Sequence, residues 1–170
     1  MDRAGYRQLP HKENDNCFGC SPNNSSGLQL QFFTDGQRVC SWLRVPRHLS
    51  GWDRIVHGGV ITTMLDEVMG WTALHLLKKM TLTRTITVRF LKPVYVDEDI
   101  RIEGVPFKIQ DERKAVMQGF LYNKKNEVCA KAKGVFALFT VHKMRERGVV
   151  DEKTLQGVEQ ILSESRIEKK

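Results

Sequence analysis

The residues best suited to chemistry in this chain lie in one stretch, His57-Gly58-Gly59 followed by Asp66 and Glu67. A glycine pair at the start of an apolar helix exposes backbone N–H groups at the positive end of the helix dipole, where a ligand carbonyl can approach closely. A carboxylate can act as a general base or as a nucleophile. The stretch therefore holds the parts that acyl-transfer chemistry needs.

Asp66 distinguishes this pattern from an ordinary loop-to-helix joint with a structural histidine. A carboxylate inside an otherwise apolar helix costs several kcal/mol unless it is hydrogen-bonded or solvated. Glu67 lies one position round the helix and is expected to pair with Lys or Arg. Helical spacing groups Asp66 with small residues, which leave room for a substrate or for another backbone: Gly59, Thr62, Thr63, Gly70 and Ala73.

The spacing of Gly59 and Asp66 has a consequence for assembly. Seven residues of helix separate them by about 10 Å along the axis, whereas groups that act on one carbon must lie near 3 Å from it. Either the two residues serve different steps, or one site combines Gly59 of one protomer with Asp66 of its partner. The second alternative predicts a two-fold dimer with two equivalent sites.

The elements that must position these residues follow from periodicity. The region 1–27 is a polar lead, and Asp35-Gly36 indicates a hairpin with a tight primed turn. A helix buried on most sides is expected over 58–80 and an amphipathic helix over 149–170. Strands are expected over 28–34, 38–45, 82–94, 99–110, 114–123 and 127–140.

The strand after the central helix carries an alternating pattern with one irregularity. Apolar Leu82, Ile86, Val88 and Phe90 should share one side, and Thr83 should share the other side with Thr85, Thr87 and Arg89. Arg84 is the exception on the apolar side.

Composition limits the class of protein. The chain has 170 residues and a net charge of +7 from dispersed Lys and Arg, which suits a small anionic ligand better than nucleic acid. No membrane span or secretory signal is evident, so a cytoplasmic location is expected. Cys17 and Cys20 form a single C-x-x-C motif in a turn-rich loop, and Cys40 and Cys129 are far apart in the sequence. Because a structural zinc site usually needs a second close pair of ligands, the cysteines are expected to be reduced thiols and not a metal site.

These motifs together resemble the hotdog-fold thioesterases, in particular the PaaI-like acyl-CoA thioesterase group, over about residues 15–140. The carriers are Asn16-Cys17-Phe18-Gly19-Cys20 with Asn24 and Gly27-Leu28, the helix start with Asp66-Glu67, and Arg89-Phe90-Leu91-Lys92-Pro93. The resemblance implies an α+β fold in which an antiparallel sheet wraps a long central helix. It divides the chain into the lead 1–27, a hotdog domain 28–142 and a C-terminal helical extension 143–170.

The resemblance also implies roles for residues in hydrolysis of acyl-CoA to acid and CoA, without a cofactor, by a homodimer or homotetramer. The Gly59 N–H would polarise the thioester carbonyl, His57 would help position it, and Asp66 of the neighbouring subunit would act as base or nucleophile. Thr83, with Thr85 as second choice, would hold that acid or its water. The expected substrate-binding residues are Gly58, Thr62, Thr63 and Thr85.

One departure from the family keeps two alternatives open. Relatives often carry Asn or Gln six residues before the histidine, where this chain has Gly51, and His48 and Asp53 in the same loop are the candidate substitutes. A non-catalytic thioester-binding protein and a hydroxyacyl-thioester dehydratase or hydratase, which would use a loop histidine such as His48, are the alternatives. Expected contacts for CoA phosphates are Arg84, Arg89, Lys92, Lys131 and Lys133.

Overall fold

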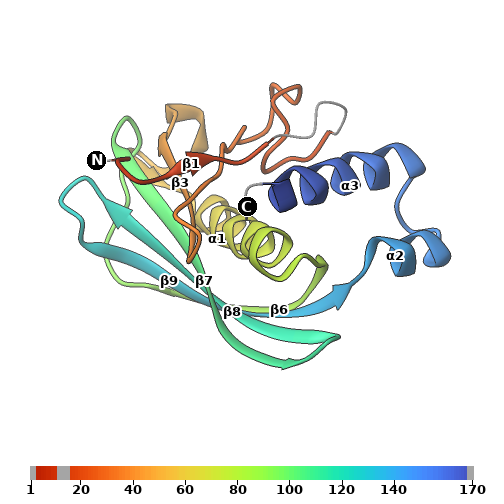
Figure 1. The fold of residues 1–170 in the computed structure, drawn as a ribbon. Helices are drawn as coiled ribbons and strands as arrows, with labels where there is room; N and C mark the ends of the chain where they lie inside the picture. The colour runs from red at the N-terminus through yellow and green to blue at the C-terminus, as the bar shows by residue number, and fades with distance from the viewer. Residues whose placement is uncertain (1–2, 11–15, 168–170) are drawn as a thin grey trace.

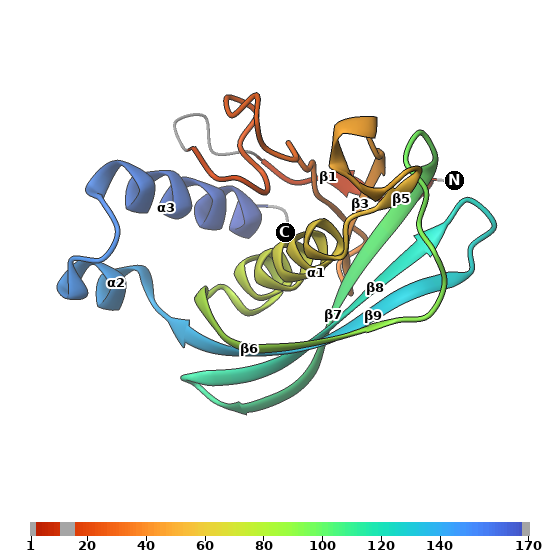
Figure 2. The ribbon, with the colours of Figure 1, turned by 180° about the vertical axis from the view of Figure 1, so that it is seen from behind.

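A computed structural model describes residues 3–10 and 16–167, with side chains to residue 163. Seven antiparallel strands in the order β1-β2-β3-β7-β8-β9-β6 form a sheet that curves around helix α1 (Gly58–Thr72), and Figures 1 and 2 show α1 in its concave face. This confirms the predicted α+β hotdog architecture. The strands are β1 (Arg7–Gln8), β2 (Phe33–Thr34), β3 (Val39–Arg44), β6 (Met80–Phe90), β7 (Asp99–Asp111), β8 (Lys114–Asn123) and β9 (Val128–Phe139).

Helix α1 packs on the sheet through the apolar stripe that the sequence predicts. Met64, Leu65 and Val68 are fully buried there. The helix approaches the sheet so closely that a Cβ on Gly104 of β7 would lie 2.6 Å from the carbonyl oxygen of Val68. The predicted burial on most sides is only partly correct, because the face with Thr62, Thr63, Asp66, Glu67 and Gly70 is partly exposed.

The predicted first hairpin is present but shorter than expected. Strand β2 holds only Phe33–Thr34, because Gln29 has a left-handed φ of 48° and the N–H groups of Leu28 and Leu30 bond the carbonyls of Phe18 and Gly19. The connection is also not a tight primed turn, because Thr34 pairs with Val39 across a four-residue loop. In this loop the Asp35 carboxylate accepts hydrogen bonds from the N–H groups of Gln37 and Arg38.

The region 46–56 and the end of the central helix also differ from expectation. A 3₁₀ turn (Arg47–Leu49) and the small hairpin β4 (Ser50–Trp52) and β5 (Ile55–Val56) lead into α1. The helix continues as a π-helical turn, Ala73–Leu77, and ends where Lys78 adopts a left-handed φ of 56°. Strand β6 therefore starts at Met80, two residues earlier than predicted.

The C-terminal region forms two helices in place of the one that was expected. They are α2 (Val141–Arg147), which Gly148 terminates in a left-handed conformation, and α3 (Glu152–Ile167). Val158 and Ile161 of α3 join the core, so its apolar face packs on the domain. Figures 1 and 2 show α3 and the loop over residues 16–30 on the side of α1 away from the sheet.

Some predictions fall where nothing is described: residues 1–2 and 11–15 of the lead, residues 168–170 of the last helix, and the side chain of Ile167. Within the described parts, no helix is long and apolar enough to cross a bilayer.

Candidate active site

Asp66 lies on the partly exposed face of α1 and is held by the strand that follows the helix. The Thr83 hydroxyl donates a hydrogen bond of 2.9 Å to Oδ1 of Asp66. Burial raises the pKa of the Asp66 carboxyl above its ordinary value, and the Thr83 hydrogen bond opposes that rise. The two residues line a pocket of about 230 Å³ with Cys17, Cys20, Glu67, Gly70, Trp71, Leu74, Met80, Thr81, Phe136 and Val158. The predicted acid therefore meets the predicted threonine at a cavity.

A β-bulge in β6 decides which threonine reaches the acid. Thr83 pairs with Phe136 and Thr85 with Val135, so Arg84 is the extra residue between them. Residues directly opposite in a ladder share a face, and Phe136 is buried toward the core. Thr83 therefore points inward and Thr85 outward, so the expectation that they share a face is wrong.

The same bulge corrects the alternation expected for this strand. Ile86 and Val88 pair with Gly134 and Ala132 and point toward the core, whereas Leu82 pairs with Ala137 and points to the other face. Arg84, the irregularity in the sequence pattern, is the bulged residue itself.

At the N-terminus of α1, His57 engages one of the two glycines. His57 is the N-cap residue, and its Nδ1 accepts a hydrogen bond of 3.0 Å from the N–H of Gly59. The N–H groups of Val60 and Ile61 bond the His57 carbonyl. Among the described residues, the Gly58 N–H has no hydrogen-bond partner and is left available at the helix terminus.

The two threonines of the first turns have their hydroxyls engaged within the helix. Thr62 donates to the Gly58 carbonyl at 2.9 Å and Thr63 to the Gly59 carbonyl at 3.1 Å. Such back-bonding leaves lone pairs on the hydroxyl oxygens but directs the hydrogens into the helix. Their role in substrate binding stays a prediction.

Gly58 and Asp66 lie at different pockets of the same chain. A second pocket, of about 500 Å³, is lined by Gly51, Trp52, Ile55, Val56, His57, Gly58, Ile61, Phe90, Leu91, Lys92, Pro93 and Val94. It shares no lining residue with the Asp66 pocket. Strand β6 borders both, since Thr81 and Thr83 line the first and Phe90 lines the second.

His48 and Asp53, the candidate substitutes for a polar side chain at position 51, do not line either pocket. Gly51 packs against His57, since a Cβ there would lie 3.2 Å from His57 Cα. His48 is in the 3₁₀ turn and Asp53 in the β4–β5 turn. No histidine lines the described part of the Asp66 pocket.

The basic residues expected to contact CoA phosphates are dispersed. Lys92 forms a 2.6 Å ion pair with Glu127. Arg89 and Lys131 are directly opposite each other in the β6–β9 ladder, on the outer face of the sheet. On that face, Nζ of Lys133 lies 3.9 Å from the centre of the Phe107 ring. Arg84 lines a separate pocket of about 570 Å³ with Lys79, Arg113, Lys143, Arg147, Glu112 and several neutral residues.

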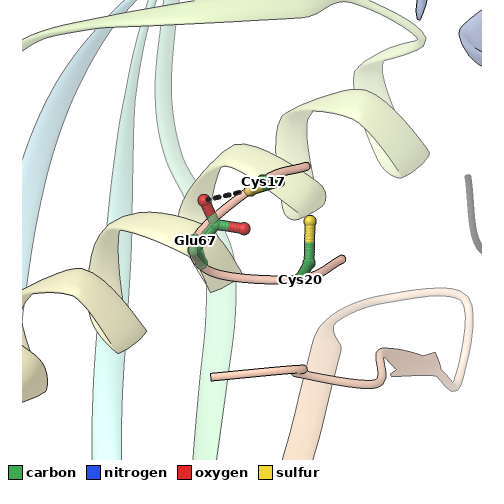
Figure 3. A group of neighbouring side chains, drawn as sticks. All are labelled: Cys17, Cys20 and Glu67. Atoms are coloured by element: carbon green, nitrogen blue, oxygen red, sulfur yellow. Dashed lines mark hydrogen bonds between the residues drawn. The ribbon is translucent and has the colours of Figure 1, made fainter. Parts of the chain in front are cut away.

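Sequence reasoning missed the surroundings of Glu67. It forms no ion pair with Lys or Arg among the described residues. Instead, its carboxylate lies beside Cys17 and Cys20 of the N-terminal loop, as Figure 3 shows, with 3.6 Å between Cys17 Sγ and Glu67 Oε1. Burial is the main cause that raises the pKa of Glu67 to about 7, with Cys17 adding to it. The close spacing of the two cysteines was visible in the sequence, but nothing there connected them to a residue 50 positions away.

Comparisons with known proteins agree with this geometry. Residues 54–130 match the family model of the Thioesterase superfamily. A crystallised thioesterase superfamily protein is 24% identical, with a TM-score of 0.66 over 72% of this chain, and the chain spans 60% of that protein. A thioesterase from Haemophilus influenzae is 18% identical with a TM-score of 0.62, covering 71% of this chain and 85% of that one. No curated protein sequence matches.

A third solved structure is a hypothetical thioesterase from Streptococcus pneumoniae with coenzyme A. It is 20% identical with a TM-score of 0.57, covering 62% of this chain and 80% of that one. Mutants of the same protein, with an aspartate and, 16 residues later, a threonine replaced by alanine, are also among the similar structures. These likenesses show the fold, and the family match is consistent with it.

Proposed function

We propose that this chain, a hotdog-fold protein with a thioesterase-superfamily match over residues 54–130, hydrolyses acyl-CoA thioesters at a site shared by two protomers. The observation that carries the proposal is the hydrogen-bonded pair of Asp66 and Thr83, which lines a pocket. At the N-terminus of the same helix, the Gly58 N–H has no hydrogen-bond partner among the described residues. An acid fixed by a hydroxyl and a backbone donor for an oxyanion are the groups that thioester hydrolysis needs.

The chemistry assigns one role to each group. Asp66 takes a proton from a water molecule, and the hydroxide oxygen bonds to the thioester carbonyl carbon. The Gly58 N–H, with the helix dipole behind it, stabilises the negative charge that develops on the carbonyl oxygen. Collapse of the tetrahedral intermediate breaks the C–S bond, and the CoA thiolate takes up the proton, so that acid and CoA are released. Direct attack by the Asp66 carboxylate, followed by hydrolysis of the anhydride, is the other route open to the same geometry.

The proposed oxyanion donor is the N–H of Gly58, in place of the Gly59 N–H that the family resemblance implies. The Gly59 N–H is bonded to His57 Nδ1, so His57 and Gly59 serve as the cap that fixes the turn. The Gly58 N–H, one residue earlier, is the group at the helix terminus that can bind a carbonyl. Thr83 positions the carboxylate by occupying Oδ1, which leaves Oδ2 for the water.

Two protomers are needed because Gly58 and Asp66 are eight residues apart on α1, about 12 Å along its axis, and line separate pockets. Strand β6 is one of the two edge strands of the sheet, and β9 is its only strand neighbour among the described residues. The Met80 end of β6 lies at the Asp66 pocket, and the Phe90 end lies at the Gly58 pocket. If two β6 strands paired antiparallel about their midpoints, the Asp66 pocket of one protomer would therefore lie against the Gly58 pocket of its partner. Exposed apolar side chains at that second pocket, Trp52 (84% exposed) and Phe90 (54%), favour such a contact.

CoA thioesters are the proposed substrate class because a similar protein is described in complex with coenzyme A. In that protein the mutated aspartate and threonine are 16 residues apart, close to the 17 that separate Asp66 from Thr83 here. The small pocket beside Asp66 favours a compact acyl group at the reacting end.

Release of free CoA from acetyl, medium-chain, long-chain and aryl thioesters tests the proposal, with Asp66→Asn as the control. The wild type should turn over at least one of these, and the variant should lose about 10²–10⁴-fold in rate. Equal turnover by both proteins would remove Asp66 from the mechanism. Binding of acyl-CoA by calorimetry without release of CoA would identify a binding protein instead.

A further inference from the structure

Three side chains that the proposed reaction does not use converge beside the Asp66 pocket. Cys17 and Cys20 come from the N-terminal loop and Glu67 comes from α1, as Figure 3 shows. One ligand atom of each, two sulfurs and a carboxylate oxygen, lie within 4.8 Å of one another, and Cys20 is buried. None of the four cysteines of the chain is in a disulfide.

The loop that carries the two cysteines is held in place by its backbone. The N–H of Ser21 bonds the Cys17 carbonyl at 3.2 Å and closes the turn. The N–H of Leu28 bonds the Phe18 carbonyl at 2.8 Å, and the N–H of Leu30 bonds the Gly19 carbonyl at 3.0 Å. The two cysteines therefore project from a fixed turn.

Gly19, between the two cysteines, has no side chain, and this allows the turn to contact the Glu67 side chain closely. A Cβ there would overlap Cγ and Cδ of Glu67, so the loop backbone lies directly against the Glu67 side chain. The carboxylate is thereby held close to the two sulfurs.

Glu67 brings a partly buried carboxylate to this cluster. Among the described residues, Glu67 has no ion-pair partner, although burying a carboxylate without one is costly. A divalent cation would supply the missing charge.

We propose that Cys17, Cys20 and Glu67 bind one zinc ion through two thiolates and a carboxylate, which leaves a fourth tetrahedral position toward the Asp66 pocket. Zinc is the metal of choice because sulfur ligands exclude Mg²⁺ and Ca²⁺, whereas Zn²⁺ binds Cys at about 2.3 Å and carboxylates at about 2.0–2.2 Å. Those bond lengths require neighbouring ligand atoms about 3.5–3.8 Å apart in a tetrahedron. The 3.6 Å between Cys17 Sγ and Glu67 Oε1 already meets this, and a small movement brings in Cys20.

Such a site would tie the N-terminal loop to α1 at the residue next to the proposed base. Binding replaces the protons of the two thiols, and that of Glu67 where it is protonated, by the metal ion. This inference does not depend on thioester hydrolysis, since the ligands are distinct from Asp66, Thr83 and Gly58.

Cobalt substitution tests the site without an activity assay. The full chain, freed of metal with a chelator under reducing conditions, is titrated with Co²⁺ and then with Zn²⁺. The expected result is a thiolate-to-cobalt charge-transfer band with the intense visible bands of tetrahedral cobalt, saturating at one ion per chain and removed by zinc. Fully reduced wild-type protein, as judged by its thiol count, that takes up no cobalt overturns the proposal.

Matched variants assign the ligands. Mutations outside the ligand shell of a metal weaken binding by about 10–100-fold, and Cys20→Ser and Glu67→Gln should weaken cobalt binding by more than that. Cys20→Ser should also lose charge-transfer intensity. Cys129→Ser is the control, because Cys129 is buried in β9 away from the cluster. Unchanged spectra in Cys20→Ser, with equal far-ultraviolet circular dichroism, would contradict the assignment. The wild-type titration remains decisive even if a variant fails to fold.

Discussion

The hydroxyl of Thr83 on β6 and the carboxylate of Asp66 on α1 are joined by a hydrogen bond of 2.9 Å. The bond exists because Arg84 bulges out of the ladder directly after Thr83, which turns Thr83 inward and Thr85 outward. Thr83 and Thr85 therefore lie on opposite faces of one strand. Because their side chains are identical, they form a matched pair for mutagenesis.

Replacement of Thr83 by Val should lower kcat by about 10–100-fold, because a hydrogen bond to a charged group contributes about 1.5–3 kcal/mol. Thr85→Val should leave kcat unchanged, since its side chain lies opposite Val135 on the outer face. Steady-state release of CoA by the two variants measures the difference. An equal loss in both would mean that the position of Thr83 at the acid has no catalytic importance.

Proline at position 58 removes the proposed oxyanion donor with little expected change in backbone conformation. Proline fits the first position of a helix, and His57 before it already has the extended conformation that a following proline favours, with φ −60° and ψ 134°. Gly58→Pro should therefore cost about 10²–10³ in kcat, as the loss of one oxyanion donor does.

Gly58→Ala is the control for that variant, because it keeps the N–H and its Cβ would meet Phe90 at an ordinary 3.5 Å. Alanine should retain far more activity than proline at equal thermal stability. Comparable turnover by the two variants would exclude the Gly58 N–H from the reaction.

His75 should make the fold sensitive to mild acid. It is buried in the π-helical turn, its Nδ1 has no hydrogen-bond partner among the described residues, and burial, with Lys78 and Arg7, lowers its pKa from 6.5 to about 4. Because the folded pKa lies below the unfolded one, the unfolded state binds the proton first as the pH falls. The free energy of unfolding should therefore be unaffected by this group above pH 6.5 and should decrease between about pH 6.5 and 4.

Urea unfolding at pH 7 and 4.5 measures this decrease. The loss in the wild type should exceed the loss in His75→Gln by about 2–3 kcal/mol. His142→Gln, at an exposed position of α2, should behave like the wild type. The assignment fails if His75→Gln and the wild type lose the same stability.

Local sequence patterns predicted the elements that hold the site well. The helix start at His57-Gly58 and the strand over 114–123 appear where periodicity placed them. Asp66 was singled out because a carboxylate stands out in an apolar helix, and its partner Thr83 followed from the family resemblance.

Features that depend on pairing between distant segments were not predictable in the same way. Arg84 looked like an irregularity, and only the ladder with β9 shows that it is a bulge that reverses the faces of β6. Glu67 looked like a surface partner for Lys or Arg, whereas its carboxylate lies against the turn at Gly19 and beside two thiols. The sequence indicated an unbonded N–H at Gly59. Its hydrogen bond to His57 Nδ1 depends on the rotamer of the His57 side chain, which a sequence pattern does not predict.

The central claim is that each active site combines Gly58 of one protomer with Asp66 of its partner, and a mixed dimer tests it most directly. Gly58→Pro and Asp66→Asn chains, each inactive alone, are coexpressed with different affinity tags, and the dimer that carries both tags is purified. One of its two sites then has both groups intact, so the mixed dimer should recover about half of the wild-type kcat per dimer. A mixed dimer as inactive as its parents would show that both groups act within one chain, and a monomeric wild type in light scattering would contradict the claim outright.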